Sequence, residues 1–213
     1  ANTREALYLH NRPGNAVSHD GAAAYMDRAI ALVRESFDTV WLRGDTDFSL
    51  TEHFDRWTSD GVKFVFGMDA MSNLVRLAEG LEEECWKPLE RRSKRARKGK
   101  RRDRRANVKE RIVKEKGYKN IRLKSEQVAE FTYRPGKCGR GYRMVVVRKN
   151  LSIEKGEDVL FDDIRYFFYI TNDTKMTARQ VVRFINGRCD HENDIEQLKN
   201  GINAMRMPSG DLH

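Results

Sequence analysis

Asp45 is a carboxylate at a position where a metal ion could be held. It follows a short run of β-branched and aromatic residues, 39–42, which predicts a buried strand. In open α/β sheets ligands bind beyond the carboxyl ends of the strands, so an acid placed there can hold a metal ion. The alternative is that Asp45 only caps the helix that follows.

A second candidate carboxylate, Glu192, lies in the C-terminal segment 178–203, which has helical spacing. At about 100° per residue one stripe of this helix collects aliphatic and charged residues together: Val181, Ile185, Arg188, Glu192, Ile195 and Lys199. Charges on a core-facing stripe are rare unless they are paired or functional. An Arg188–Glu192 ion pair is the structural alternative, and Glu196, at the edge of the stripe, is the alternative carboxylate.

The positive charge of the chain is concentrated in residues 91–105. The 213 residues carry a net charge of +9, and this block holds eleven Lys or Arg and one Asp, so the rest is close to neutral. With no aromatic residue among them, the cations offer salt-sensitive, sequence-neutral contacts to DNA phosphates. The alternative is a solvated linker. The cations are Arg91, Arg92, Lys94, Arg95, Arg97, Lys98, Lys100, Arg101, Arg102, Arg104 and Arg105.

The elements that must position these residues alternate in type along the first 66 residues. Apolar patterning predicts strand, helix, strand, helix and strand at 6–10, 22–37, 39–42, 49–57 and 62–66. Ser18 is the expected N-cap of the first helix, and Ser49 to Glu52 is the expected capping box of the second. Such alternation predicts an α/β layer with parallel strands.

The chain then changes character. Residues 69–125 are expected to be helical and increasingly charged. Antiparallel strands are expected at 131–133, 142–147 and 166–170, between turns rich in Gly and Pro. The helical segment 178–203 completes the pattern.

At this point the residues resemble a known family. Phe184 to Glu192 (FINGRCDHE), with Lys199 seven residues later, is similar to the Y-x2-R-x3-E-x6-K motif of bacterial DDE transposases, and residues 42–48 (LRGDTDF) are similar to their R-x-D-x-x-F segment. Residues 11–15 (NRPGN) and 18–22 (SHDGA) also resemble the insertion-sequence subgroup called transposase DDE domain group 1. There are two departures: Ile185 replaces the motif Tyr, and Asp47 replaces a common Gly.

The resemblance implies an α/β fold with a ribonuclease-H-like (retroviral-integrase-like) core interrupted by a β-rich, basic insertion. The core would comprise residues 1–68 and 172–213, and the insertion residues 69–171, with a basic helical arm at 85–125 and antiparallel strands at 130–171. Asp45 would be the second catalytic, metal-binding acid and Glu192 the third. Because the family's first aspartate lies on an earlier strand, the resemblance also implies a fragment that is incomplete at both ends.

The implied chemistry is cleavage and transfer of DNA strands at insertion-sequence ends. Two Mg²⁺ ions, with Mn²⁺ as a substitute, would clamp the attacking and leaving oxygens. Arg188 and Lys199 match positions that contact transposon-end phosphates. The partners would be double-stranded DNA, both transposon ends and target, with a homodimer formed on the DNA. With Asp45 and Glu192 alone, we expect weak metal binding and no strand transfer.

Composition limits the other function classes. No stretch approaches the roughly 18 apolar residues of a membrane span, and no signal peptide is evident. Three scattered cysteines fit a reducing compartment, so a cytoplasmic protein associated with the nucleoid is expected. Two alternatives stay open, a non-enzymatic DNA-binding protein and a ribonuclease-H-type nuclease without strand transfer.

Overall fold

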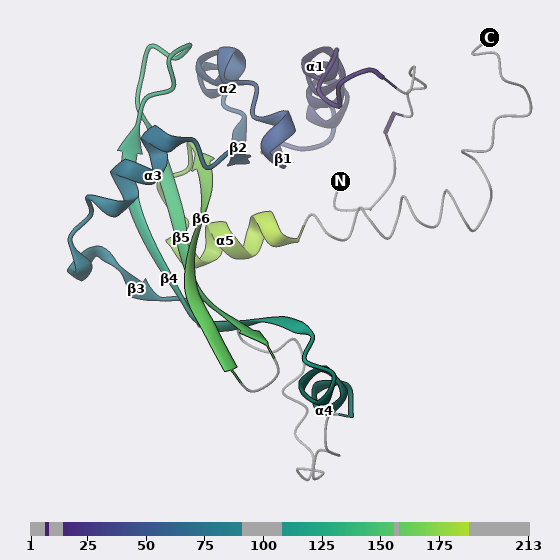
Figure 1. The fold of residues 1–213 in the computed structure, drawn as a ribbon. Coiled ribbons are helices and arrows are strands. Elements are labelled where there is room, and N and C mark those ends of the chain that lie inside the picture. Colours follow the sequence, from purple (N-terminus) through teal and green to yellow (C-terminus); the bar gives the residue numbers. More distant parts are fainter. Residues whose placement is uncertain (1–6, 9–14, 91–107, 156–157, 188–213) are drawn as a thin grey trace, which may run out of the picture. The chain divides into compact units, whose positions relative to one another are not determined.

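The computed structural model describes residues 7–8, 15–90, 108–155 and 158–187 (Figure 1). These residues fall into two compact units. The first draws on Ala1–Asp69, Glu130–Val145 and Phe168–His213, and the second on Ala70–Ala129 and Val146–Phe167. Within the described residues no helix has the length and apolar character needed to cross a membrane.

The described strands form a mixed sheet in the order β1-β2-β6-β5-β4-β3. Their bounds are β1 Trp41–Gly44, β2 Lys63–Met68, β3 Lys87–Pro88, β4 Lys119–Tyr133, β5 Tyr142–Lys155 and β6 Asp158–Thr171. β1 runs parallel to β2, with Gly44 opposite Phe66, and β2 runs antiparallel to β6, with Val65 opposite Thr171. The chain is therefore a mixed α/β protein, as the sequence predicts.

An aromatic core lies between the sheet and a short helix in the first unit. This unit contains α1 (Ala22–Arg34), the 3-10 turns η1 (Thr46–Phe48) and η2 (Thr51–His53), α2 (Phe54–Ser59) and α5 (Ala178–Asn186). The Phe54 ring of α2 stacks on Phe64 of β2, with centroids 4.5 Å apart, and on Phe66, at 5.7 Å. Both these rings and Trp57 are fully buried. Burial of these large rings anchors α2 on β2.

The second unit has a smaller core around Trp86. It contains α3 (Ser72–Glu79), the 3-10 turn η3 (Glu83–Cys85), β3, α4 (Val108–Glu115) and parts of β4, β5 and β6. The Trp86 ring packs 6.2 Å from Tyr166, and the Arg148 guanidinium lies 4.3 Å above it. Arg148 Nε also donates to Gln127 Oε1 at 3.0 Å. Trp86 is therefore a packing residue, not an exposed surface for stacking a base.

Both predicted helix caps near the N-terminus are wrong. The N-cap of α1 is Gly21, at φ 68°, and not Ser18. Ser49 does not cap a helix either, because its hydroxyl donates to the Thr46 carbonyl at 2.7 Å and α2 begins only at Phe54. At Ser49 the local turn competes successfully for the side chain that the sequence pattern assigned to the cap.

The predicted strands and helices have different outcomes. Strands are confirmed at β1 and β2, and the three short antiparallel strands are confirmed as parts of the longer β4, β5 and β6. The helical assignment of residues 119–125 is wrong, because β4 already begins at Lys119. Leu7 and Tyr8 lie in no strand, and the rest of the strand expected at 6–10 is outside the described residues.

Candidate active site

Asp45 directly follows β1 and is partly buried. It occupies the N-cap position of η1, where its backbone carbonyl accepts the Phe48 N–H at 3.3 Å. The structure describes every residue of η1, and the Asp45 side chain makes no capping hydrogen bond to any of them. The capping alternative for the Asp45 carboxylate is therefore wrong.

Two glycines allow the backbone around Asp45 to lie close to β2. A Cβ on Gly67, in β2, would come within 3.1 Å of the Thr46 nitrogen and 3.3 Å of the Asp45 carbonyl carbon. A Cβ on Gly44 would lie 2.8 Å from Phe48 Cβ. Real Cβ atoms rarely approach this closely, so glycine at both positions sets where the Asp45 backbone lies.

Arg43 joins the end of α5 to β1, two residues before Asp45. Its Nη1 donates to the Phe184 carbonyl at 2.9 Å, and its guanidinium lies 5.3 Å from the Phe184 ring centroid. The Trp41 ring packs on the same phenylalanine at 5.2 Å. A Cβ on Gly187 would lie 2.7 Å from Arg43 Nη1, so the chain leaves α5 directly beside this arginine.

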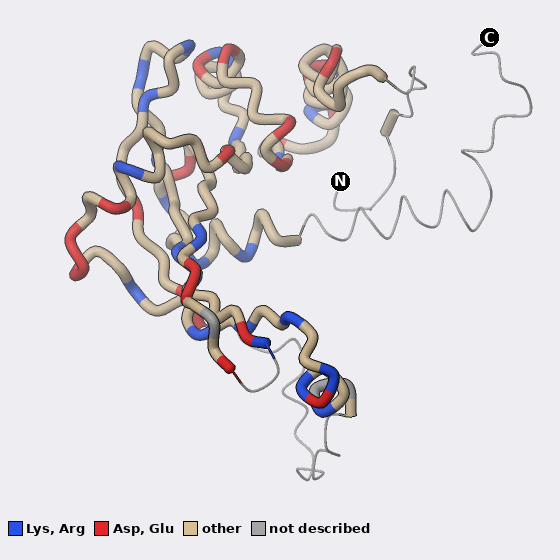
Figure 2. Tube along the Cα trace, viewed as in Figure 1, with Lys and Arg blue, Asp and Glu red and all other residues tan. Residues whose placement is uncertain are grey.

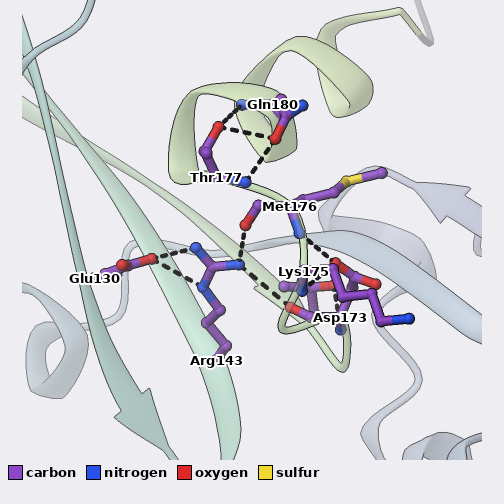
Figure 3. A network of polar contacts seen from close by, with 8 residues as sticks. Glu130, Arg143, Asp173, Lys175, Met176, Thr177 and Gln180 are labelled. Carbon is purple, nitrogen blue, oxygen red and sulfur yellow. Dashed lines mark hydrogen bonds and ion pairs between the residues drawn. The ribbon is translucent and has the colours of Figure 1, made fainter.

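The described part of α5 agrees with the stripe predicted for it. Val181 and Ile185 are buried, which confirms that this side of the helix faces the core. Ile185, at the motif Tyr position, is 2% exposed and packs as an ordinary core residue. The helix begins with a capping box that the sequence analysis missed, in which Thr177 and Gln180 bond each other's backbone N–H (Figure 3). The T-x-x-Q spacing was the signal that could have revealed it.

The other predicted site residues lie outside the described residues. These are Arg188, Glu192, Glu196, Lys199 and the basic block 91–105. Within the described ranges no group of three or more His, Cys, Asp or Glu side chains could hold a metal ion. Figure 2 shows acidic and basic residues side by side on α4.

A titratable cluster that sequence reasoning missed fastens the β4–β5 turn to α2. Asp55 Oδ1 accepts the Tyr142 hydroxyl at 2.5 Å, and its Oδ2 accepts the Gly139 N–H at 2.6 Å. These bonds hold the pKa of Asp55 below its usual value. Burial, together with the bond to Asp55, raises the pKa of Tyr142 to about 12. The pKa of the Cys138 thiol is raised to about 11, mainly by burial and to a lesser extent by nearby carboxylates. This cysteine is therefore an unreactive packing residue.

Asp27, on α1, is likewise structural. It accepts Trp57 Nε1 at 2.9 Å and forms an ion pair with Arg56 at 2.8 Å. Partial burial alone would raise the pKa of Asp27, but the bonds from Arg56 and Trp57 outweigh it and lower the pKa. The carboxylate therefore ties α1 to α2.

Comparison with protein families finds a match over the whole chain. The model of a family described as transposase DDE domain group 1 matches residues 1–213, while no curated protein and no solved structure matches the chain. Proteins of this family are transposases, which act on DNA, and they generally use divalent metal ions. The match confirms the family resemblance drawn from the sequence motifs. The chain belongs to the transposase DDE domain group 1 family.

Proposed function

We propose that this chain supplies two acids of a metal-dependent site that cleaves and transfers DNA strands at insertion-sequence ends. Asp45 is the second acid and Glu192 the third. The main observation in support of the proposal is the hydrogen bond from Arg43 to the Phe184 carbonyl, near the end of α5. Arg43 lies two residues before Asp45 in the sequence. Glu192 follows the last described residue, Gly187, by five positions.

The proposed architecture is a ribonuclease-H-like core of residues 1–68 and 172–213, interrupted by an insertion at 69–171. The parallel pairing of β1 with β2 supports it, because parallel strands joined through a helix are the mark of an α/β core. The buried side of α5 supports it as well, because Val181 and Ile185 make this helix part of the same unit as β1 and β2.

The residues fit a divalent metal site. A partly buried carboxylate beyond a strand end offers the oxygen ligands that Mg²⁺ prefers, and Asp45 lies directly after β1. Asp45 and Glu192 together would repel each other without a cation between them. Two Mg²⁺ ions, or Mn²⁺ in their place, would supply activation of the attacking oxygen and stabilisation of the leaving one.

The remaining residues of the proposed site bind the nucleic acid. Arg188 and Lys199 would contact phosphates of the transposon end, as the family motif implies. The basic block 91–105 would contact the backbone of double-stranded DNA, end or target, without reading its sequence. We further propose that the protein acts as a homodimer on DNA, in the cytoplasm at the nucleoid.

Iron-directed backbone cleavage tests the metal site directly. Fe²⁺ replaces Mg²⁺ in oxygen-ligated sites, and with ascorbate and peroxide it cuts the chain close to where it is bound. We expect cuts near residues 45 and 192 that Mg²⁺ suppresses and Asp45→Asn removes. Asp47→Asn is the matched control, because Asp47 is an exposed neighbour outside the proposed site. Equal cutting of wild type and Asp45→Asn would refute the assignment of Asp45.

A DNA assay separates the enzyme from the alternatives. With transposon-end DNA and Mg²⁺, we expect DNA binding but no strand transfer from Asp45 and Glu192 alone. Strand cleavage that Glu192→Gln abolishes while DNA binding persists would show a site more complete than these two acids. Deleting residues 91–105 should weaken binding and reduce its dependence on salt concentration. Binding without metal-directed cuts would instead identify a non-enzymatic DNA-binding protein, and cleavage without joining to target DNA would identify a nuclease.

A further inference from the structure

The connection between β6 and α5, residues 172–177, is held by the side chain of Arg143 on β5 (Figure 3). Arg143 Nη1 donates to the Met176 carbonyl at 2.5 Å and to the Asp173 carbonyl at 3.3 Å. Its Nε donates to Glu130 Oε2, across on β4, at 2.8 Å. The Arg143 side chain is 19% exposed, so these charge-assisted bonds are largely shielded from water.

The rest of the connection is also fixed by hydrogen bonds from within. Asp173 Oδ1 accepts the N–H groups of Lys175 at 2.9 Å and of Met176 at 2.7 Å. The Asp173 N–H donates to Thr171 Oγ1 at 3.0 Å, and that hydroxyl donates to the Phe64 carbonyl of β2 at 2.6 Å. Asp173 and Thr171 are buried. The turn is therefore tied to β2 at one side and to Arg143 at the other.

The Arg143 contacts act on the first turn of α5. Met176 immediately precedes Thr177, the N-cap of the helix, so fixing its carbonyl fixes where the helix starts. Arg43 holds the Phe184 carbonyl at the other end of the same helix. An arginine thus binds a main-chain carbonyl at each end of α5. A lysine could not reproduce the forked geometry with which Arg143 reaches Glu130 and both carbonyls.

We propose that Arg143 is a positioning residue for the proposed metal site: by fixing the start of α5, it fixes the helix from which the chain continues to Glu192. This inference rests on the proposed function. Arg143 is not among the residues proposed to bind metal or DNA. Its effect passes through α5, so its loss should disturb Glu192 and leave Asp45, which is held by β1, Gly44 and Gly67, in place.

Amide hydrogen exchange tests the mechanical half of the proposal. Arg143→Gln and Arg143→Lys should make the amides of residues 181–186 exchange roughly tenfold faster or more, the range expected for losing hydrogen bonds to a charged donor. The amides of β2 should keep their wild-type rates. Glu130→Gln is the matched control, because it removes the ion pair but leaves both carbonyl bonds, so its effect on α5 should be smaller.

Iron-directed cleavage tests the functional half. In Arg143→Lys we expect the cut near residue 45 to persist and the cut near residue 192 to weaken or move. Unchanged exchange of α5 in Arg143→Gln would overturn the proposal, and so would equal loss of both cuts, which indicates general destabilisation. If wild type gives no cut near residue 45, the proposed function itself fails. The exchange rates of α5 then still show whether Arg143 holds the helix.

Discussion

A single methyl group added at Gly67 should displace the backbone segment that carries Asp45. In Gly67→Ala the new Cβ would lie 3.1 Å from the Thr46 nitrogen, 3.2 Å from Thr46 Cγ2 and 3.3 Å from the Asp45 carbonyl carbon. Two of these atoms are backbone and cannot rotate away. β2 itself is paired on both sides, to β1 and β6, so the segment carrying Asp45 must give way by a few tenths of an ångström.

The cost follows from two opposing effects. Overpacking a tight site costs about 1–3 kcal/mol. Replacing glycine stiffens the unfolded chain and returns about 0.4–1 kcal/mol. The net loss should be about 1–2 kcal/mol, which in a chain of this size lowers Tm by roughly 2–8 °C. In the same variant the iron-directed cut near residue 45 should weaken, because its ligand has moved.

The assay is thermal unfolding followed by circular dichroism, together with the iron-directed cut. Gly136→Ala is the matched control, because a Cβ at Gly136 meets no atom within 4 Å; it should keep the full cut and unfold at or slightly above the wild-type temperature. A Gly67→Ala protein that unfolds at the wild-type temperature and keeps the full cut would refute the claim that close approach at Gly67 sets the position of Asp45.

Three further predictions concern other buried groups. Since its pKa is raised to about 12, folded Tyr142 keeps a proton that the unfolded chain loses near pH 10, and the resulting stability is complete below about pH 10 and lost as the pH rises through 12. Tyr142→Phe should therefore flatten the fall of the unfolding free energy between about pH 10 and 12. If urea titrations at several pH values gave the same fall in wild type and variant, this would be contradicted. Peptide mapping after brief alkylation at pH 8 should find exposed Cys85 modified and buried Cys138 protected, and equal labelling would show that the thiol of Cys138 is accessible. Ser152 is fully buried, and among the described residues its hydroxyl has no hydrogen-bond partner. Ser152→Ala should therefore raise the unfolding free energy by about 1 kcal/mol. A lower unfolding free energy in denaturant titrations would instead show that the hydroxyl has a partner.

The parts of the fold that the sequence predicts are those with a local signal. Residues 39–42 and 62–66 are short apolar runs rich in β-branched and aromatic residues, and β1 and β2 lie within one or two positions of them. The helical spacing of Val181 and Ile185 likewise identifies the buried side of α5. Asp45 could be identified from the sequence as a candidate metal ligand because it follows such a strand. This position along the chain can be recognised without knowing any tertiary contact.

At the start of β4 the sequence has the alternating pattern of a strand, but the high charge of the segment hides it. In residues 119–125 the apolar Ile121 and Leu123 alternate with polar neighbours, which is the period of a strand. The high charge of this segment and its position after a basic block favour a helix instead. Both apolar side chains are about half exposed, so burial of one face does not explain why this segment is extended.

Contacts that hold the candidate site are set by tertiary structure and leave no pattern in the sequence. Arg43 and Phe184 are 141 positions apart, and Arg143 reaches a connection about 30 positions downstream. Both arginines bind carbonyl oxygens of the main chain, and any residue type supplies these. The placement of α5 therefore rests on these carbonyl contacts together with the burial of Val181 and Ile185. Ile185, at the motif tyrosine position, takes part in this placement as a buried apolar side chain, while Arg43 and Arg143 hold the two ends of the helix through its main chain.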